Sequence, residues 1–100
     1  MSDSRPLLLL AVESIFPLGQ LTATPGALEA LSNEEMQSAL NRHASGDWGE
    51  LDQHDRIENA RALRNGLRLL SAYNSNNGTR FWIITEHDRS VTTILLPQEY

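Results

Sequence analysis

The sequence predicts one small α+β domain, in which an antiparallel meander of three to four strands is covered by two helices. Two segments in the first half carry apolar residues every three or four positions, and the second half alternates apolar and polar residues with a period of two. Residues typical of tight turns separate the alternating segments. Helices followed by strands with short turns are typical of α+β domains. The 100 residues, 40% of them hydrophobic, suffice for one core.

The first 17 residues are expected to form an extension or arm, and residues 18–100 the domain. An apolar run of six residues, 7–12, lies between Pro6 and Pro17. It is shorter than the roughly 7–15 apolar residues of a signal peptide or the about 20 of a membrane span. We interpret it as a strand or an apolar arm that packs on the domain or on a second subunit. We expect a cytoplasmic protein without membrane contact, and the absence of cysteine suits that compartment.

Capping residues mark the starts of three helices. Thr24 can cap a short helix that Pro25 opens, because proline at the first helical position loses no hydrogen bond. Ser32 and Glu35 form a capping box for a second helix, which ends at residues 45–46. The third helix begins near Asp52 and ends at Asn65 and Gly66. The residues expected on the inner faces of the second and third helices are Met36, Ala39, Leu40, His43, Ile57, Ala60 and Leu63.

Alternating segments and turn residues predict the strands. Asn77 and Gly78 suit a hairpin turn, and Pro97 ends the last strand. Segment 80–86 carries large apolar groups on both faces, so we place it at the centre of the meander. The expected strands span residues 18–23, 68–73, 80–86 and 91–96. The residues expected to be largely buried are Leu40, Ile57, Phe81, Trp82, Ile83, Ile84 and Leu95.

Charge is distributed unevenly along the chain. Thirteen acidic residues against eight basic ones give a net charge of −5, and all eight basic residues are Arg. Residues 29–58 hold eight acids and two Arg, whereas residues 61–89 hold five Arg and two acids. An acidic total disfavours nucleic acid as a partner, because phosphate binding needs cations, and favours a basic protein surface. The absence of cysteine excludes a disulfide framework, a thiol nucleophile and a cysteine-ligated metal.

Three segments resemble a known family. They are LTATPGALEAL at residues 21–31, SGDWGEL at 45–51 and WIITEHDRSVTTILLPQEY at 82–100. Together they resemble the plasmid-related proteins, a family of small bacterial proteins found on plasmids, integrative elements and phage-like islands. Some members carry the label type I restriction endonuclease subunit M, but 100 residues without a methyl-donor motif do not hold a methyltransferase domain. The resemblance covers about residues 18–100 and implies no established catalytic residues.

The densest set of metal-ligating residue types lies between residues 43 and 58. His54 and Glu58 are four positions apart, which would place two ligands on one helix face. No HExxH or calcium-loop spacing accompanies them. We favour the alternative, an acidic helix start that suits the helix dipole, and expect no metal and no cofactor. The candidate ligands are His43, Asp47, Glu50, Asp52, His54, Asp55 and Glu58.

The turn at residues 86–90 contains an acid, a histidine and a hydroxyl, the groups of acid–base or nucleophilic catalysis. Catalytic triads are assembled from separate parts of a fold, whereas these groups share one turn. We favour a structural interpretation, in which Asp88 bonds the turn backbone and Arg89 pairs with Glu86.

Two further features allow opposite interpretations. Arg61, Arg64 and Arg68, joined by Arg80, would contact phosphate or a base if they formed an exposed stripe. We favour pairing of this stripe with the acidic middle of the chain. Trp48 is interpreted as a core residue under a loop, or as a partner-binding hot spot if its ring is exposed.

The leading hypothesis is a non-enzymatic protein-interaction module from a mobile genetic element. Its acidic helix face, formed by Glu34, Glu35, Glu50, Asp52 and Asp55, would bind a host or element-encoded protein. One form of this hypothesis is inhibition of a host defence nuclease by acids placed where DNA phosphate would lie. Self-pairing to a homodimer, through a sheet edge or the apolar arm, is also considered. The candidate contact residues are Trp48, Glu50, Asp52, Asp55, Arg61, Arg64, Glu86, Asp88 and Arg89.

The alternative hypothesis is a small metal-dependent or hydrolytic enzyme centred on His43, His54 and the 86–90 turn. A deep pocket that joins His54 to this turn would favour the enzyme, and a flat charged face would favour the binding module.

Overall fold

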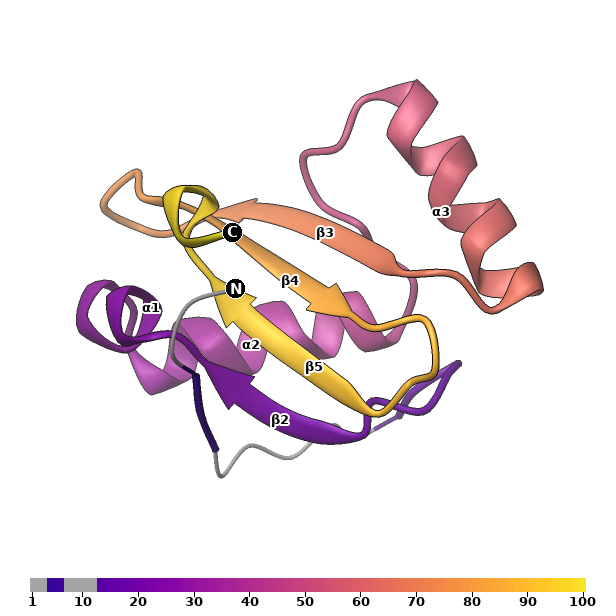
Figure 1. The fold of residues 1–100 in the computed structure, drawn as a ribbon. Helices are drawn as coiled ribbons and strands as arrows, with labels where there is room; N and C mark the ends of the chain where they lie inside the picture. Colours follow the sequence, from indigo (N-terminus) through magenta and orange to yellow (C-terminus); the bar gives the residue numbers. More distant parts are fainter. Residues whose placement is uncertain (1–3, 7–12) are drawn as a thin grey trace.

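A five-stranded mixed sheet organises the chain in the computed structural model, which describes residues 4–6 and 13–100 (Figure 1). The predicted α+β class is confirmed. The apolar run at residues 7–12 lies outside the described residues. The elements are β1 (Arg5–Pro6), β2 (Gln20–Ala23), α1 (Pro25–Ala30), α2 (Asn33–Ala44), α3 (Gln53–Asn65), β3 (Leu69–Asn74), β4 (Arg80–Thr85), β5 (Val91–Leu95) and the 3-10 turn η1 (Pro97–Glu99).

The sheet has the strand order β1-β2-β5-β4-β3. Strands β3, β4 and β5 form the predicted antiparallel meander, with β4 in its middle. Strand β2 pairs with β5 in parallel, so the prediction of a wholly antiparallel sheet is wrong at this position. The helices between β2 and β3 carry the chain to the far edge of the sheet, and a long crossover of this kind permits parallel pairing. Strand β1 then adds two antiparallel residues outside β2.

The predicted helix signals are confirmed at each helix. The Thr24 side chain accepts a hydrogen bond from the Ala27 amide, and Ser32 and Glu35 form a reciprocal capping box. Asp52 caps α3, and Gly66 ends it with a φ of 66°. Helix α2 lies across one face of the sheet, whereas α3 stands beside the outer strand β3 (Figure 1). One of the two helices expected to cover the sheet therefore covers its edge instead.

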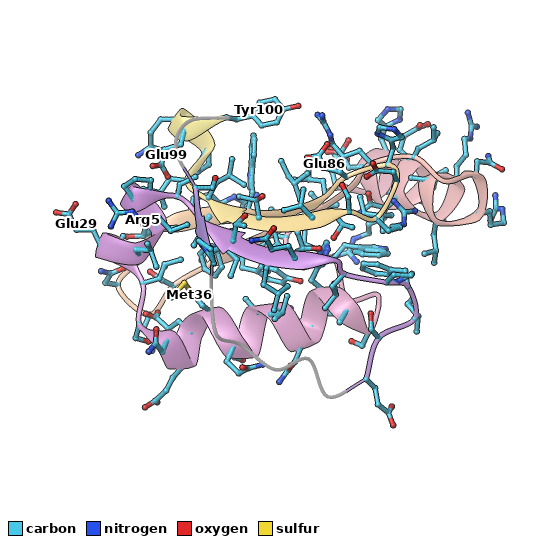
Figure 2. All side chains as sticks on the ribbon, turned by 60° about the horizontal axis from the view of Figure 1, so that its bottom comes forward. Arg5, Glu29, Met36, Glu86, Glu99 and Tyr100 are labelled. Atoms are coloured by element: carbon cyan, nitrogen blue, oxygen red, sulfur yellow. The ribbon has the colours of Figure 1, made fainter. Side chains whose placement is uncertain are left out.

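The main core lies between α2 and the sheet, and Met36 points from α2 into it (Figure 2). The predicted burial of five residues is confirmed, namely Leu40, Phe81, Ile83, Ile84 and Leu95. The prediction for Ile57 is wrong, because its side chain is 55% exposed. Helix α3 turns Asn59 and Ala62 inward instead. Trp82 is half-buried, on the face opposite α2, where its ring centroid lies 5.9 Å from that of Tyr100.

A second core joins α3 to the rest of the domain. It contains Phe16, Trp48, Ala62 and Leu69. Phe16, which belongs to the predicted N-terminal extension, thus packs inside the domain. Among the described residues, no helix has the length and apolar character needed to cross a membrane.

Candidate functional site

His43 is buried completely and hydrogen-bonded at both ring nitrogens. Its Nδ1 lies 2.6 Å from Ser71 Oγ, and its Nε2 lies 2.9 Å from Thr85 Oγ1. Thr85 Oγ1 in turn lies 2.7 Å from Thr92 Oγ1, and the Thr92 hydroxyl donates to the Leu18 carbonyl over 2.7 Å. These contacts form one chain of hydrogen bonds that crosses from α2 through three strands.

The last of these hydrogen bonds, from Thr92 to the Leu18 carbonyl, determines which atom donates in each of the others. Thr92 uses its only hydrogen on the Leu18 carbonyl, so Thr85 must donate to Thr92. His43 Nε2–H then donates to Thr85, and Ser71 donates to His43 Nδ1. Burial, with a smaller contribution from the nearby Arg89 charge, lowers the pKa of His43 from 6.5 to about 3. The His43 ring is therefore neutral, and both of its nitrogens have hydrogen-bond partners. Its burial keeps a substrate from reaching it.

Trp48 lies in the same buried region. Its ring stacks on Phe16 with centroids 6.2 Å apart and meets the edge of His43 at 5.7 Å. With 8% of its surface exposed, Trp48 is a core residue under the loop, which is the first of its two interpretations, and not an exposed ring.

The parts of the hypothetical enzyme site do not come together. His43 is in the core, whereas His54 is exposed in the first turn of α3. The 86–90 turn meets the other end of α3, where Arg89 bonds the Ala62 carbonyl. Eight residues of helix, about 12 Å, separate His54 from that end. Within residues 4–6 and 13–100, no group of three or more His, Cys, Asp or Glu side chains could hold a metal ion.

Asp88 and Arg89, two charged residues of the 86–90 turn, both make hydrogen bonds that hold the structure together. Asp88 accepts hydrogen bonds from the Ser90 amide at 3.0 Å and the Ser90 hydroxyl at 2.6 Å, which lower the pKa of its carboxyl group. This is the predicted Asp88 contact. Arg89 has a φ of 60° and donates to the carbonyls of Leu67 at 2.6 Å, Glu86 at 3.0 Å and Ala62 at 3.2 Å.

The predicted ion pair between Arg89 and the Glu86 carboxylate is wrong. Glu86 pairs with Arg68 at 3.2 Å, because Arg89 turns toward the carbonyls at the end of α3. Arg68 also donates to the Tyr100 hydroxyl. Helix α3 ends at Asn65, so Arg68 lies outside the helix and only Arg61 and Arg64 remain of the predicted stripe on it. Both are exposed.

The predicted acidic face divides into two parts. Asp52 and Asp55 lie at the start of α3, where the Asp52 side chain accepts the Asp55 amide at 2.9 Å. Glu34 and Glu35 lie in the first turn of α2, beside the β3–β4 hairpin. Glu50 is exposed next to the outer edge of β3, where its amide donates to the Ala72 carbonyl.

An acidic groove of about 320 Å³ runs between α2 and the β3–β4 hairpin. We define it by its two walls: Glu34, Glu35, Ser38 and Arg42 on α2, and residues 73–76 on the hairpin side. This groove was not predicted from the sequence. Two acids after a capping serine and an asparagine-rich hairpin were visible in the sequence, but their proximity depends on how α2 packs on the sheet.

Glu35 joins the two walls of the acidic groove. One carboxylate oxygen accepts the Ser32 amide at 3.1 Å, and the other accepts the Asn76 amide at 2.8 Å. The bond from Asn76, followed by that from Ser32, lowers the pKa of Glu35. Glu35 therefore carries its negative charge at neutral pH.

Arg42, the one cation among the described residues that line the acidic groove, already has a counter-ion. Arg42 donates to both carboxylate oxygens of Asp47, over 2.7 and 3.2 Å, and this contact lowers the pKa of Asp47. Its guanidinium carbon also lies 4.7 Å from the centroid of the Tyr73 ring. The charges of Glu34 and Glu35 therefore remain uncompensated by the lining of the groove.

No family model, curated protein or solved structure matches this chain.

Proposed function

We propose that this chain is a non-catalytic protein-interaction module that binds a basic surface of a partner protein through its acidic groove. The observation that supports it best is the pair of carboxylates, Glu34 and Glu35, on the wall of a groove where the lining cation Arg42 is paired with Asp47. Exposed carboxylates of this kind steer cationic partners and add specificity to binding. The acids at the start of α3, Asp52 and Asp55, belong to a separate surface.

The second part of the proposal concerns the genetic origin of the module and the protein that it binds. The resemblance of residues 18–100 to plasmid-related proteins supports an origin on a mobile genetic element. An acidic protein of such an element would act on a host protein whose basic surface normally contacts DNA phosphate, as in a defence nuclease. A net charge of −5 suits that mode of binding.

The proposal is tested by charge reversal. The wild-type protein and the variant Glu34→Arg are immobilised and used to capture proteins from a bacterial lysate at about 0.1 M and about 0.5 M salt. We expect the wild type to retain specific proteins at low salt, and the Glu34→Arg variant to lose them. Screening shortens the range of exposed charges from about 10 Å at 0.1 M salt to a few ångströms near 1 M.

The matched control is Glu58→Arg, which makes the same change in net charge on the exposed side of α3. Retention by this control, with loss by the Glu34→Arg variant, assigns binding to the acidic groove. Equal retention by all three proteins, or retention that is indifferent to salt, contradicts the proposal. Addition of duplex DNA tests the proposed target. If the captured protein uses its DNA-binding surface to bind the module, duplex DNA should release it.

A further inference from the structure

The outer edge of β3 is covered along part of its length. In an antiparallel pair, alternate residues turn their backbone groups toward and away from the partner strand. Ala72 turns away from β4: its N–H donates to the Trp48 carbonyl at 3.1 Å, and its carbonyl accepts the Glu50 amide at 2.7 Å. Leu70 also turns away, and its N–H donates to the Asn59 side chain at 3.1 Å. Asn59 and the segment 48–50 therefore occupy the edge at these two positions.

Asn74 is the next residue whose backbone turns outward. It lies two positions beyond Ala72 and opposite Arg80 in the same register. Within the described part of the chain, no hydrogen bond reaches its N–H or C=O, because the chain leaves the edge after Glu50 and enters α3. Asn74 is exposed and lines the acidic groove. The groove thus contains a free strand edge beside two carboxylates.

We infer that the acidic groove receives an extended segment of the partner protein that carries arginine or lysine. This inference rests on the proposed function and deepens it. The backbone of the segment pairs with the N–H and C=O of Asn74, which extends the edge cover that begins at Trp48–Glu50. Its cationic side chains contact Glu34 and Glu35. Addition of a strand to a free edge supplies affinity through backbone bonds, and charge selects the segment.

The size and lining of the groove favour a peptide segment. About 320 Å³ is at the lower end of ligand pockets, which suits a few residues of extended chain better than a folded surface. Asn74, Ser75 and Asn76 make the hairpin wall polar beside the buried Tyr73, and Asn74 offers the free N–H and C=O that strand addition requires. The carboxylates are complementary in charge to a basic segment and repel an acidic one.

The probe is the peptide acetyl-Arg-Thr-Arg-Thr-Arg-amide, titrated into ¹⁵N-labelled full-length protein and followed by NMR. We expect shifts at the amides of Glu34, Glu35 and Asn74, and slower hydrogen exchange at Asn74. The same peptide with glutamate in place of arginine should not bind. Binding of the arginine peptide should weaken at about 0.5 M salt.

The matched variants are Asn74→Pro and Asn74→Ala. Proline removes only the outward N–H, since the ladder bonds to β4 belong to Tyr73, and proline is tolerated on an edge strand with its nitrogen facing out. Loss of one backbone bond predicts a Kd about three- to tenfold higher for Asn74→Pro, with little change for Asn74→Ala. If Asn74→Pro does not fold, exchange at the Asn74 amide of the wild-type protein decides the question.

The outcomes separate this inference from the proposed function. Equal peptide affinity of the two Asn74 variants, with weaker binding by Glu34→Arg, overturns strand addition and leaves the charged interaction module standing. Equal binding of the arginine and glutamate peptides, or no binding at the groove, contradicts both. Protection of the Asn74 amide in the free protein, together with a dimeric mass in sedimentation, would assign the edge to a second copy of the chain and overturn the inference.

Discussion

At the scale of single residues, the buried His43 shows how a titratable group is kept neutral in a core. Both ring nitrogens have hydrogen-bond partners, so burial leaves no polar atom of the ring unsatisfied. An unsatisfied buried donor or acceptor would cost about 1–3 kcal/mol. The hydrogen bonds from Ser71 to the Leu18 carbonyl fit the neutral ring with its hydrogen on Nε2. Protonation of His43 would make Nδ1 a donor, so the Ser71 hydroxyl would have to turn and accept, and it would place a charge in the core.

The first prediction is that the stability of the protein falls as the pH drops from about 6.5. The pKa of His43 is about 3 in the folded protein and 6.5 when unperturbed, so the unfolded chain binds more protons between these values. The stabilisation is complete above pH 6.5 and is lost toward pH 3, with a slope of up to about 1.4 kcal/mol per pH unit. Urea unfolding at pH 7, 6 and 5 measures it.

His43→Gln provides the control for this prediction. The variant should be less stable at pH 7, but its free energy of unfolding should change less between pH 7 and pH 5 than that of the wild type. Equal pH dependence of the two proteins would show that another group titrates in this range.

At the scale of elements, the edge of β3 depends on a close approach of the chain at Gly49. Gly49 has a φ of 74°, and a Cβ added there would lie 2.1 Å from the Ala72 carbonyl oxygen. That oxygen also accepts a hydrogen bond from the Glu50 amide. The segment at Gly49 therefore lies so close to β3 that it covers the strand edge and leaves no room for a side chain. Helix α3 completes the cover with Asn59, which explains why this amide is buried and the more hydrophobic Ile57 is not.

The second prediction compares two glycines that share a left-handed conformation. Gly49→Ala should destabilise the fold by about 3 kcal/mol or more, because it adds a clash with backbone to the cost of the positive φ. Gly66→Ala should cost only about 1–2 kcal/mol, since a Cβ there meets nothing within 4 Å. Urea denaturation measures both values, and equal losses would contradict the close approach at Gly49.

The third prediction concerns the link between the 86–90 turn and α3. Arg89→Met should cost about 1–3 kcal/mol, because it removes the charged donor from the carbonyls of Ala62, Leu67 and Glu86. Arg64→Met, on the exposed side of α3, should change stability by less than about 0.5 kcal/mol. Hydrogen exchange should also become faster at the end of α3 in the Arg89 variant. An unchanged exchange pattern there would remove Arg89 as the link.

At the scale of the whole molecule, the domain has one core between α2 and the sheet and a second, smaller core beneath α3. The face of the sheet opposite α2 carries the 3-10 turn η1, and Glu86 and Tyr100 lie on that side (Figure 2). The acidic groove opens where α2 and the hairpin diverge. Its geometry therefore depends on the main core, although none of its charges is needed to form that core.

The fourth prediction uses two isoleucines with opposite environments. Ile83 is fully buried, so Ile83→Ala should cost about 2–5 kcal/mol in the free energy of unfolding. Ile57 is 55% exposed, so Ile57→Ala should change that free energy by less than about 0.5 kcal/mol. Chemical denaturation of both variants checks the assignment of the cores. A large loss for Ile57→Ala would mean that α3 packs with a different face inward.

The sequence alone determined the local structure of this protein. Helix caps at Thr24, Ser32 and Asp52, the end of α3 at Gly66 and the meander of the last three strands were all predictable. Each depends on residues within a few positions of one another, where backbone hydrogen bonding and turn conformation decide the outcome. The segregation of acids and arginines, from which the charged function was proposed, is also a property of the sequence.

Only the tertiary structure decided which distant groups meet. The parallel pairing of β2 with β5, the exposure of Ile57 and the turning of Arg89 toward α3 depend on how whole elements pack. The acidic groove arises in the same way, because α2 and the hairpin bring Glu35 and Asn76 together across 41 positions of the chain. Such contacts are selected by the fit of complete faces and by the need to satisfy buried backbone groups, and neither can be read from spacing along the chain.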